Sequence, residues 1–366
     1  MPTHNAENER VKHRYFAYLK EAQRRGEPSV DAAAKAFNRF ETYTRFKSFR
    51  VFHHEQAIGF KRHLAEQTNA RTGKPLSKAT IFSTLAALKA FFFWLAGQPG
   101  FRSRLSYSDA DYFNMAERDA RIARTRLDKP FPSLEQVQYV ISLMPSADAI
   151  QLRDRALVAF VLLTGVRDGA VVSLQLKHVD LAENCVVQDA REVATKFGKS
   201  FTTWFFPVGD VALLILQEWV EYSTKTLLRG PADPLFPATL VDGGAGQAFH
   251  AIGLARQHWT TADPVRAVFK RAFMAAGLPY YSPHRLRDTL ASLGKRHCRT
   301  AEEFQAWAQN LGHSSMATTF ANYGAVAGAR QAEIIRGITV GAAPADQALE
   351  AVAALVAKLQ GRPAQP

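Results

Sequence analysis

The sequence predicts a mainly α-helical fold with a small antiparallel β-sheet, arranged as two domains. Its 366 residues exceed the length of one typical domain. Apolar residues recur at helical spacing along most of the chain. Two β-rich runs, ENCVVQDA and SFTTWFFPV, flank the basic tip REVATKFGK, a pattern typical of a β-hairpin. We therefore expect helices to dominate both domains and a strand pair to lie in the second.

The N-terminal domain is expected to be a helical bundle over residues 1–100. Its clearest helix runs from 77 to 97, with Ser77 as the N-cap and Gly97 as the stop. One continuous apolar stripe follows this helix, formed by Ile81, Leu85, Leu88, Phe92 and Leu95. Two further helices are expected at 29–46, with Ser29 as a candidate N-cap, and at 53–68.

Mixed charges between two proline-containing turns indicate a linker over residues 101–130. Ser133 with Gln136 forms a capping-box pattern, so a second domain is expected over 131–340. Within it we expect helices at 133–145, 150–163 and 210–224, a surface loop at 229–248, and further helices from 263. The tail, 341–366, carries an apolar stripe at helical spacing, formed by Leu349, Val352, Val356 and Leu359.

Composition favours a polyanionic partner. The formal net charge is +13 and the isoelectric point about 9.8, which suits binding to phosphates, although charge alone leaves ribosome-like or membrane-surface binding open. Cys185 and Cys298 have no metal-ligand spacing, so neither a disulfide framework nor a zinc site is indicated. The N-terminus lacks the apolar core of a secretory signal, and the apolar run 156–163 is too short to span a bilayer. We expect a soluble, cytoplasmic protein with no membrane partner.

Basic residues concentrate between positions 45 and 78, where eight Lys or Arg stand against Glu55 and Glu66. Such a run can be an ordinary solvated face or a DNA-contacting face. The candidate DNA-binding residues are Arg45, Lys47, Arg50, Lys74, Lys78 and, in the hairpin tip of the second domain, Lys199.

Five polar residues occur in three local frames in the second half of the chain. LTGVRDGAVVSL contains Arg167, SPHRLRDTLASLG contains His284 and Arg287, and NLGHSSMATTFANYG contains His313 and Tyr323. Alone, each has an ordinary interpretation: a structural salt bridge, a chance four-residue spacing, or a half-buried tyrosine. Together, two guanidiniums, two imidazoles and a phenol suffice to break a phosphodiester without a metal, because guanidiniums can neutralise the charge that develops on phosphate oxygens.

These three frames resemble the motifs of the tyrosine recombinase family, also called phage integrases. The resemblance implies a helical core-binding domain followed by an α+β catalytic domain. It implies that Tyr323 is the nucleophile, that Arg167 and Arg287 clamp the phosphate, and that His284 and His313 assist. A hairpin lysine serves as the proton donor; the pattern TKFGK favours Lys196, with Lys199 as the alternative. The chain departs from the family pattern at Ala170, where relatives carry an acid, and at Asp288, where they often carry histidine.

The reaction that the resemblance implies is site-specific DNA recombination or integration. Cleavage and rejoining would proceed through a 3′-phosphotyrosyl intermediate in a tetramer on two duplexes, without metal, ATP or other cofactor. DNA-bending or directionality proteins would be accessory partners, and the tail would dock on a neighbouring protomer or fold back on its own domain. The alternatives are a type IB topoisomerase-like enzyme, a non-catalytic DNA-binding protein on the same fold, and a basic structural or RNA-binding protein.

Overall fold

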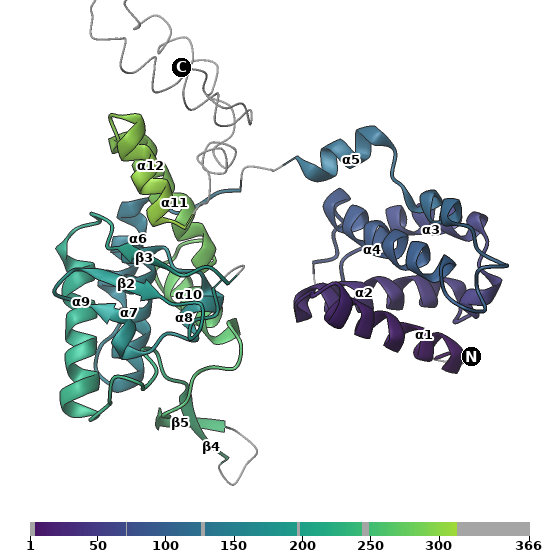
Figure 1. The fold of residues 1–366 in the computed structure, drawn as a ribbon. Coiled ribbons are helices and arrows are strands. Elements are labelled where there is room, and N and C mark those ends of the chain that lie inside the picture. The colour runs from purple at the N-terminus through teal and green to yellow at the C-terminus, as the bar shows by residue number, and fades with distance from the viewer. Residues whose placement is uncertain (1–3, 71, 126–128, 196–197, 244–248, 313–366) are drawn as a thin grey trace, which may run out of the picture. The chain divides into compact units, whose positions relative to one another are not determined.

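The computed structural model describes residues 4–70, 72–125, 129–195, 198–243 and 249–312 (Figure 1). The chain divides into two compact units, 1–127 and 128–366, and each has its own hydrophobic core. The predicted fold class is confirmed: both units are mainly helical, and the strands form small antiparallel sheets.

Unit 1 is a helical bundle. Its elements in chain order are α1 (Ala6–Ala17), η1 (Tyr18–Ala22), α2 (Glu27–Thr44), η2 (Phe49–Val51), α3 (His54–Glu66), α4 (Lys78–Ala96), η3 (Tyr107–Phe113) and α5 (Glu117–Arg124). Aromatic rings fill its core. Phe92 packs against Phe52 and Phe113, with ring centroids 4.1 and 5.2 Å away. Such close ring packing adds to the stabilisation from burial and favours one arrangement of the helices.

The central helix of unit 1 is α4, which begins and ends where the sequence predicts. The Ser77 hydroxyl accepts the Thr80 N–H, and Gly97 follows the last turn. Among the described residues, α4 is the one helix long and apolar enough to cross a membrane by length and composition alone. However, Leu88, Phe91, Phe92 and Leu95 on this helix are buried in the unit 1 core, and a core helix passes the same test.

Two expectations for unit 1 differ from the structure. Helix α2 begins at Glu27 rather than Ser29, because Pro28 is well suited to a first helical turn and Gly26 takes the N-cap position. Residues 101–125 are no linker: they form η3 and α5 and contribute Phe101, Leu105, Ala110 and Phe113 to the buried core. The two units meet in the chain at 127/128, close to the predicted domain start at 131.

Unit 2 begins with α6 (Leu134–Leu143), whose N-terminus has the predicted capping box of Ser133 and Gln136. The next elements are α7 (Ala149–Thr164), α8 (Asp168–Val171) and η4 (Leu176–His178). Helix α7 is buried along most of its length and forms the centre of the unit 2 core. Its second half, 156–164, is buried on all sides, because α6, α9, α10 and α11 pack around the helix.

A three-stranded antiparallel sheet follows, in the order β1 (Val179–Asp180), β2 (Cys185–Gln188), β3 (Phe201–Trp204). The predicted strand pair is confirmed as β2 and β3, with Cys185 opposite Trp204 and Gln188 opposite Phe201. Strand β3 is therefore an edge strand. The loop between β2 and β3 carries the predicted basic tip.

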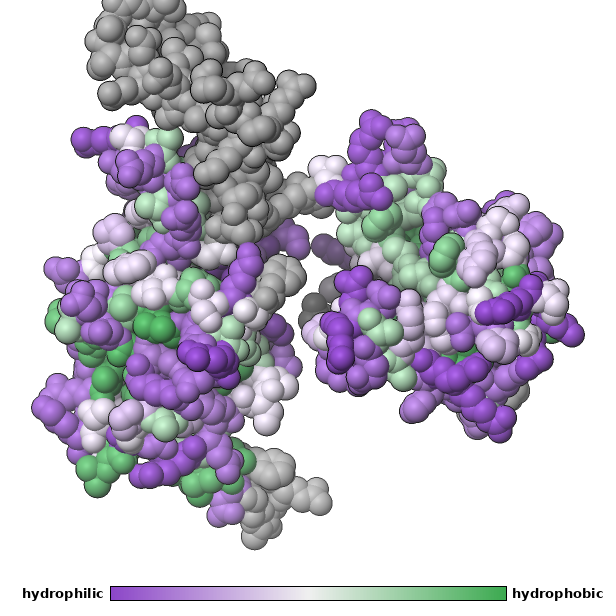
Figure 2. Space-filling view, in the orientation of Figure 1, coloured by the Kyte–Doolittle hydropathy of each residue, from purple (hydrophilic) through white to green (hydrophobic). Residues whose placement is uncertain are grey.

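The remaining elements are α9 (Asp210–Glu221), η6 (Tyr222–Thr226), β4 (Thr239–Gly243), β5 (Phe249–Leu254), α10 (Asp263–Ala275), α11 (Pro283–His297) and α12 (Ala301–Asn310). The region expected to be a surface loop, 229–248, instead contributes β4 to an antiparallel hairpin with β5. Leu240, Val241 and Ile252 of this hairpin are exposed. Figure 2 shows hydrophobic surface at the lower end of unit 2, where Figure 1 places the hairpin. The tail, 341–366, lies outside the described residues.

Candidate active site

The turn after α7 places Arg167. Gly165 ends the helix in the left-handed conformation, with φ +60°, and its N–H donates to Val161 O at 2.8 Å. An added Cβ would lie only 3.0 Å from side-chain carbons of both Leu290 and Leu311, so the position favours glycine for space as well as for φ. The Thr164 hydroxyl accepts the Val166 N–H at 3.2 Å and so closes the turn. The motif TGVR therefore encodes a compact reversal that directs the chain into α8.

Arg167 is a half-buried cation at the start of α8. Burial lowers the pKa of its guanidinium; an arginine nevertheless stays protonated at neutral pH. Its side chain makes no hydrogen bond or ion pair within the part of the chain that the structure describes. A partly desolvated cation without a carboxylate partner is costly unless it binds an anion. Among the described residues, therefore, Arg167 forms no structural salt bridge.

Arg287 lies on α11 and is almost fully buried, with 5% of its surface exposed. Its Nη1 donates to the carbonyl oxygen of Gly165, and its Nη2 donates to that of Leu311. These two contacts fix the plane of the guanidinium. They also tie the turn that carries Arg167 to the helix that carries Arg287, so the two predicted arginines lie on segments that are bonded to each other.

His284 lies one helical turn before Arg287 and reaches the surface. Partial exclusion of water lowers the pKa of its imidazole, the positive charge of Arg287 lowers it further, and Arg285 and Arg167 add smaller contributions. Asp288 opposes them, although its carboxylate is itself paired with Arg285. The imidazole is therefore mainly neutral at pH 7 and can accept a proton or a hydrogen bond. The charges of both Arg167 and Arg287 thus act on this imidazole.

An ion pair between Asp168 and Arg266, which the sequence did not suggest, joins the start of α8 to α10. Asp168, the first residue of α8, accepts from Arg266 of α10 at 2.8 Å, and Arg266 also pairs with Asp263 of its own helix. The backbone N–H of Gly169 donates to the other Asp168 carboxylate oxygen. Because Asp168 and Arg266 are 98 positions apart, no local pattern in the sequence could reveal their contact.

The profile of the phage integrase family matches residues 133–330, more than half of the chain and all three frames. The chain belongs to the phage integrase family. This confirms the resemblance to the tyrosine recombinases. The chain is therefore a tyrosine-type site-specific recombinase by enzyme class.

Curated relatives extend the match toward the N-terminus. The chain is 25% identical over 263 residues to tyrosine recombinase XerC of Ralstonia pickettii, covering 70% of this chain and 72% of the relative. It is 24% identical over 277 residues to XerC of a Roseiflexus species, covering 75% and 74%. The match to XerD of Neisseria meningitidis, 27% identical over 199 residues, covers 53% of this chain and only 59% of that relative.

Solved structures have the same fold. A lambda integrase dimer bound to a COC′ core site has a TM-score of 0.57 at 13% identity, covering 92% of this chain and 79% of the other. The Tn1549 transposon integrase in complex with transposon right end DNA has a TM-score of 0.54 at 14% identity, covering 89% and 98%. At these identities the similarity establishes the fold of this phage integrase family member.

The structure leaves part of the predicted site undescribed. Lys196, His313 and Tyr323 lie outside the described residues, and the description ends at Gly312. Lys199 is exposed in the loop between β2 and β3. The carboxylate of Glu192 anchors the start of that loop. It accepts one hydrogen bond from Nζ of Lys177 and one from Nε2 of buried His178, both at 2.8 Å. No group of three or more potential metal ligands is found in the described part of the chain.

The candidate DNA-binding residues of unit 1 fall into two classes. All five are exposed. Arg50 pairs with Glu7 and lies over the Phe101 ring at 5.4 Å, and Lys78 pairs with Asp119. Arg45, Lys47 and Lys74 make no ion pair with any residue that the structure describes. These three are therefore the better candidates for phosphate contacts.

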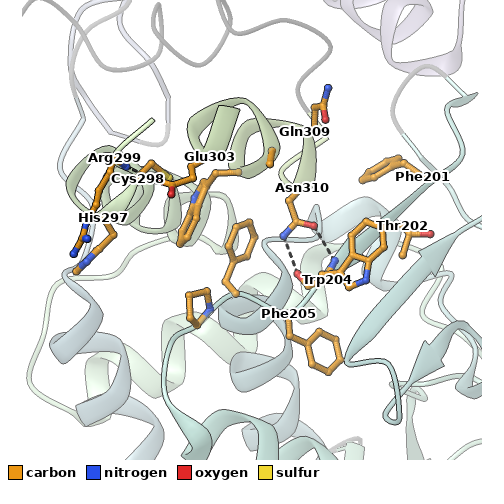
Figure 3. Close-up of a pocket in the computed structure, with 14 residues that line it drawn as sticks. Phe201, Thr202, Trp204, Phe205, His297, Cys298, Arg299, Glu303, Gln309 and Asn310 are labelled. Carbon is orange, nitrogen blue, oxygen red and sulfur yellow. Dashed lines mark hydrogen bonds between the residues drawn. The ribbon is translucent and has the colours of Figure 1, made fainter. Parts of the chain in front are cut away.

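A pocket of about 870 Å³ opens between β3 and α12 (Figure 3). Apolar and aromatic side chains form much of its wall, including Trp204, Phe206 and Trp307. Neither Arg167, His284 nor Arg287 is among the described residues that line it. Within the described residues, this pocket is therefore separate from the arginine site.

Proposed function

We propose that this phage integrase family member cleaves and rejoins duplex DNA at specific sites through a 3′-phosphotyrosyl intermediate, with neither metal nor ATP. The observation that carries the proposal is Arg167, a half-buried cation with no partner among the described residues. It stands on a turn bonded to buried Arg287. Two guanidiniums on one site suit an anion with several oxygens, and the phosphate of DNA is such an anion.

In the first step, the phenol oxygen of Tyr323 forms a bond to phosphorus while the bond from phosphorus to the 5′ oxygen breaks. Arg167 and Arg287 stabilise the charge that develops on the non-bridging oxygens. His284 accepts the phenolic proton, which its lowered pKa permits at pH 7. A phenol with an ordinary pKa near 10 needs such help.

Two further groups complete the step. Lys196 in the hairpin tip gives a proton to the departing 5′ oxygen, with Lys199 as the alternative donor. His313 donates a hydrogen bond to a non-bridging oxygen. A 5′ hydroxyl from a partner duplex then attacks the phosphotyrosyl bond and releases the phenol. Because one phosphate ester replaces another at each step, no energy source is required.

Duplex DNA is the proposed partner. The lambda and Tn1549 integrases of similar fold are bound to DNA in their structures. The net charge of +13 and the exposed Arg45, Lys47 and Lys74 suit contacts to phosphates. We further propose a tetramer on two duplexes, assembled through the tail. A chain ending at Gly341 should then bind single sites but fail in synapsis; unchanged assembly on DNA would exclude docking by the tail.

The proposed chemistry can be tested without knowing the target site. A library of randomised duplexes, each with a nick that lets the short cleaved strand diffuse away, traps a covalent intermediate. Complexes that survive SDS are collected and sequenced. We expect the wild-type protein to enrich one sequence as a covalent adduct, and Tyr323→Phe to bind that sequence without forming the adduct.

Tyr280→Phe is the matched control, because Tyr280 is an exposed tyrosine close to Asp168 and Arg266. It should form the adduct as the wild type does. Relaxation of a supercoiled plasmid that lacks the enriched sequence would favour a topoisomerase-like enzyme. Sequence-specific binding by the wild type without any adduct would instead indicate a non-catalytic DNA-binding protein.

A further inference from the structure

The C-terminal end of α12 is bonded to the free edge of the three-stranded sheet. The Oδ1 of Asn310 accepts the backbone N–H of Trp204 at 2.8 Å, and its Nδ2 donates to the backbone carbonyl of Trp204 at 2.8 Å (Figure 3). One side-chain amide thus supplies the donor and the acceptor that a neighbouring strand would present to β3. Aspartate, leucine or alanine could not make both bonds.

The backbone of Asn310 belongs to the same network. The Thr203 hydroxyl donates to the carbonyl of Asn310 at 3.1 Å, and it accepts from Nε2 of Gln188 at 3.1 Å. Gln188 and Thr203 are almost fully buried, with 3% and 1% of their surfaces exposed. A chain of hydrogen bonds therefore runs from β2 through β3 into the last residue of α12. Buried polar networks of this kind fix one relative placement of the elements that they join.

The two residues after Asn310 contact the arginine site and the sheet. Leu311 is buried, and its carbonyl accepts from Nη2 of Arg287. Gly312 has φ +67°, and an added Cβ would lie 2.9 Å from the ring of Phe201 in β3. The turn at 311–312 is thus confined between Arg287 and β3. The next residue in the sequence is His313.

We propose that Asn310 is a positioning residue for phosphate binding. By holding the end of α12 on β3, it fixes the Leu311 carbonyl that orients Arg287 and the point from which the chain enters His313. This inference rests on the proposed function, in which both Arg287 and His313 act on the non-bridging oxygens. Asn310 itself touches neither DNA nor the reacting atoms in this proposal.

The test compares Asn310→Ala with Gln309→Ala. Gln309 is the exposed neighbour on α12, and its side chain points away from Trp204 (Figure 3). On the trapped sequence, single-turnover adduct formation at saturating DNA should fall by about 10- to 100-fold in Asn310→Ala, since misplacement by about 1 Å can cost that much. The dissociation constant for DNA should change by less than about twofold, because phosphate contacts elsewhere dominate affinity. Gln309→Ala should match the wild type in both measurements.

A second substrate separates phosphate binding from proton donation. When sulfur replaces the bridging 5′ oxygen, the leaving group departs without a proton, so a defect in the lysine donor disappears. We expect the defect of Asn310→Ala to persist on this substrate. Recovery of the wild-type rate would overturn the inference, because it would show that the amide serves the hairpin lysine rather than Arg287 and His313.

Folding and the proposed function are controlled separately. If Asn310→Ala does not unfold cooperatively in urea, Asn310→Asp takes its place, because aspartate keeps the acceptor for the Trp204 N–H and loses the donor. An equal rate of adduct formation in the wild type and the folded variant overturns the inference alone. Absence of adduct in the wild type overturns the proposed function, and the inference with it.

Discussion

Arg167 and Arg287 differ in their burial and in the hydrogen bonds that fix their side chains. Arg287 is buried and donates to the carbonyls of Gly165 and Leu311, whereas Arg167 is half-buried and makes no ion pair among the described residues. One guanidinium is therefore part of the framework, and the other stands at its surface. If both bind the same phosphate, they should contribute similarly to chemistry but very differently to stability.

Replacing each arginine by alanine tests this difference. Both Arg167→Ala and Arg287→Ala should lower the rate of adduct formation by about 10²- to 10³-fold, as loss of an oxyanion-stabilising donor does. Arg287→Ala should also lower the free energy of unfolding by about 1–3 kcal/mol, because two carbonyl oxygens lose a buried partner. Arg167→Ala should change it by less than about 0.5 kcal/mol. Urea unfolding and single-turnover kinetics measure the two effects. Equal destabilisation by both variants would contradict the distinction.

The environment of His284 leads to a pH prediction. Its pKa is lowered in the folded protein by partial exclusion of water and by Arg287, whereas in the unfolded chain it has the ordinary value near 6.5. The stability linked to this group is therefore fully present above pH 6.5 and is lost as the pH falls through the folded-state pKa. An NMR titration should give an imidazole pKa below 6.5 in the wild type and a higher one in Arg167→Ala.

The variant His284→Asn identifies the resonance and serves as the control for stability. Between pH 7 and pH 5 it should lose less free energy of unfolding than the wild type, because it lacks the group that resists protonation. An imidazole pKa at or above 6.5 in the wild type would contradict the prediction. So would an unchanged pKa in Arg167→Ala.

At the scale of elements, local sequence signals predicted several helix ends correctly, although not the start of α2. The caps at Ser77 and Ser133 and the stop at Gly97 depend on residues within one turn of each other, so they can be read locally. The contacts of the site are long-range. Arg287 reaches Gly165 across 122 positions, and Asn310 reaches Trp204 across 106. The motifs predict which side chains belong to the site, but they do not show which residues hold Arg287 and the end of α12 in place.

The hairpin of β4 and β5 shows another limit of local patterns. Its strands are exposed on most positions, so burial leaves no alternation of apolar and polar residues to recognise. Leu240, Val241 and Ile252 are apolar and yet lie at the surface. Because Gly243, Gly244 and Gly246 are close together in the sequence, the segment resembles a loop in composition. The pairing of β4 with β5 is made by backbone hydrogen bonds, so the spacing of apolar side chains in the sequence does not predict it.

The turn that joins α7 to α8 can be tested through its glycine. Gly165→Ala adds a Cβ at a position where φ is +60°. The added Cβ would lie 3.0 Å from side-chain carbons of both Leu290 and Leu311. We expect a loss of about 1–3 kcal/mol in the free energy of unfolding, together with slower adduct formation, since Arg287 bonds to this residue. Gly169→Ala is the matched control: it lies in α8 with nothing within 4 Å of the added carbon. If both substitutions cost the same, steric confinement of the turn is excluded.

At the scale of the whole molecule, the chain is built from two units with separate cores. The boundary between them was expected after residue 100, because proline and glycine at 99–100 and the charges that follow are typical of a linker. The apolar residues that place the segment after residue 100 in the unit 1 core are few and irregularly spaced. Phe101, Leu105 and Phe113 are all buried in the unit 1 core. Their partners lie on α2, α4 and the segment between α2 and α3, which only the tertiary structure brings near.

Two fragments distinguish these boundaries. Residues 1–127 should fold cooperatively in isolation, because their aromatic core is complete. Residues 1–100 lack Phe113, whose ring lies 5.2 Å from Phe92 and 5.7 Å from both Phe40 and Phe52. Loss of one such buried ring typically costs about 3–5 kcal/mol, a large fraction of the stability of a small domain. The shorter fragment should therefore unfold at much lower urea or remain unfolded.

The variant Phe113→Ala in the longer fragment separates packing from chain length. It should move the urea midpoint most of the way toward that of 1–100, because the same cavity opens beside Phe92. Tyr112→Ala is its neighbour control: Tyr112 is 41% exposed and stacks on His54 at the surface, so its removal should have a small effect. Equal midpoints for 1–100 and 1–127 would show that residues 101–125 are a linker after all. Circular dichroism of the four proteins in urea gives the answer for unit 1 without reference to DNA or to the rest of the chain.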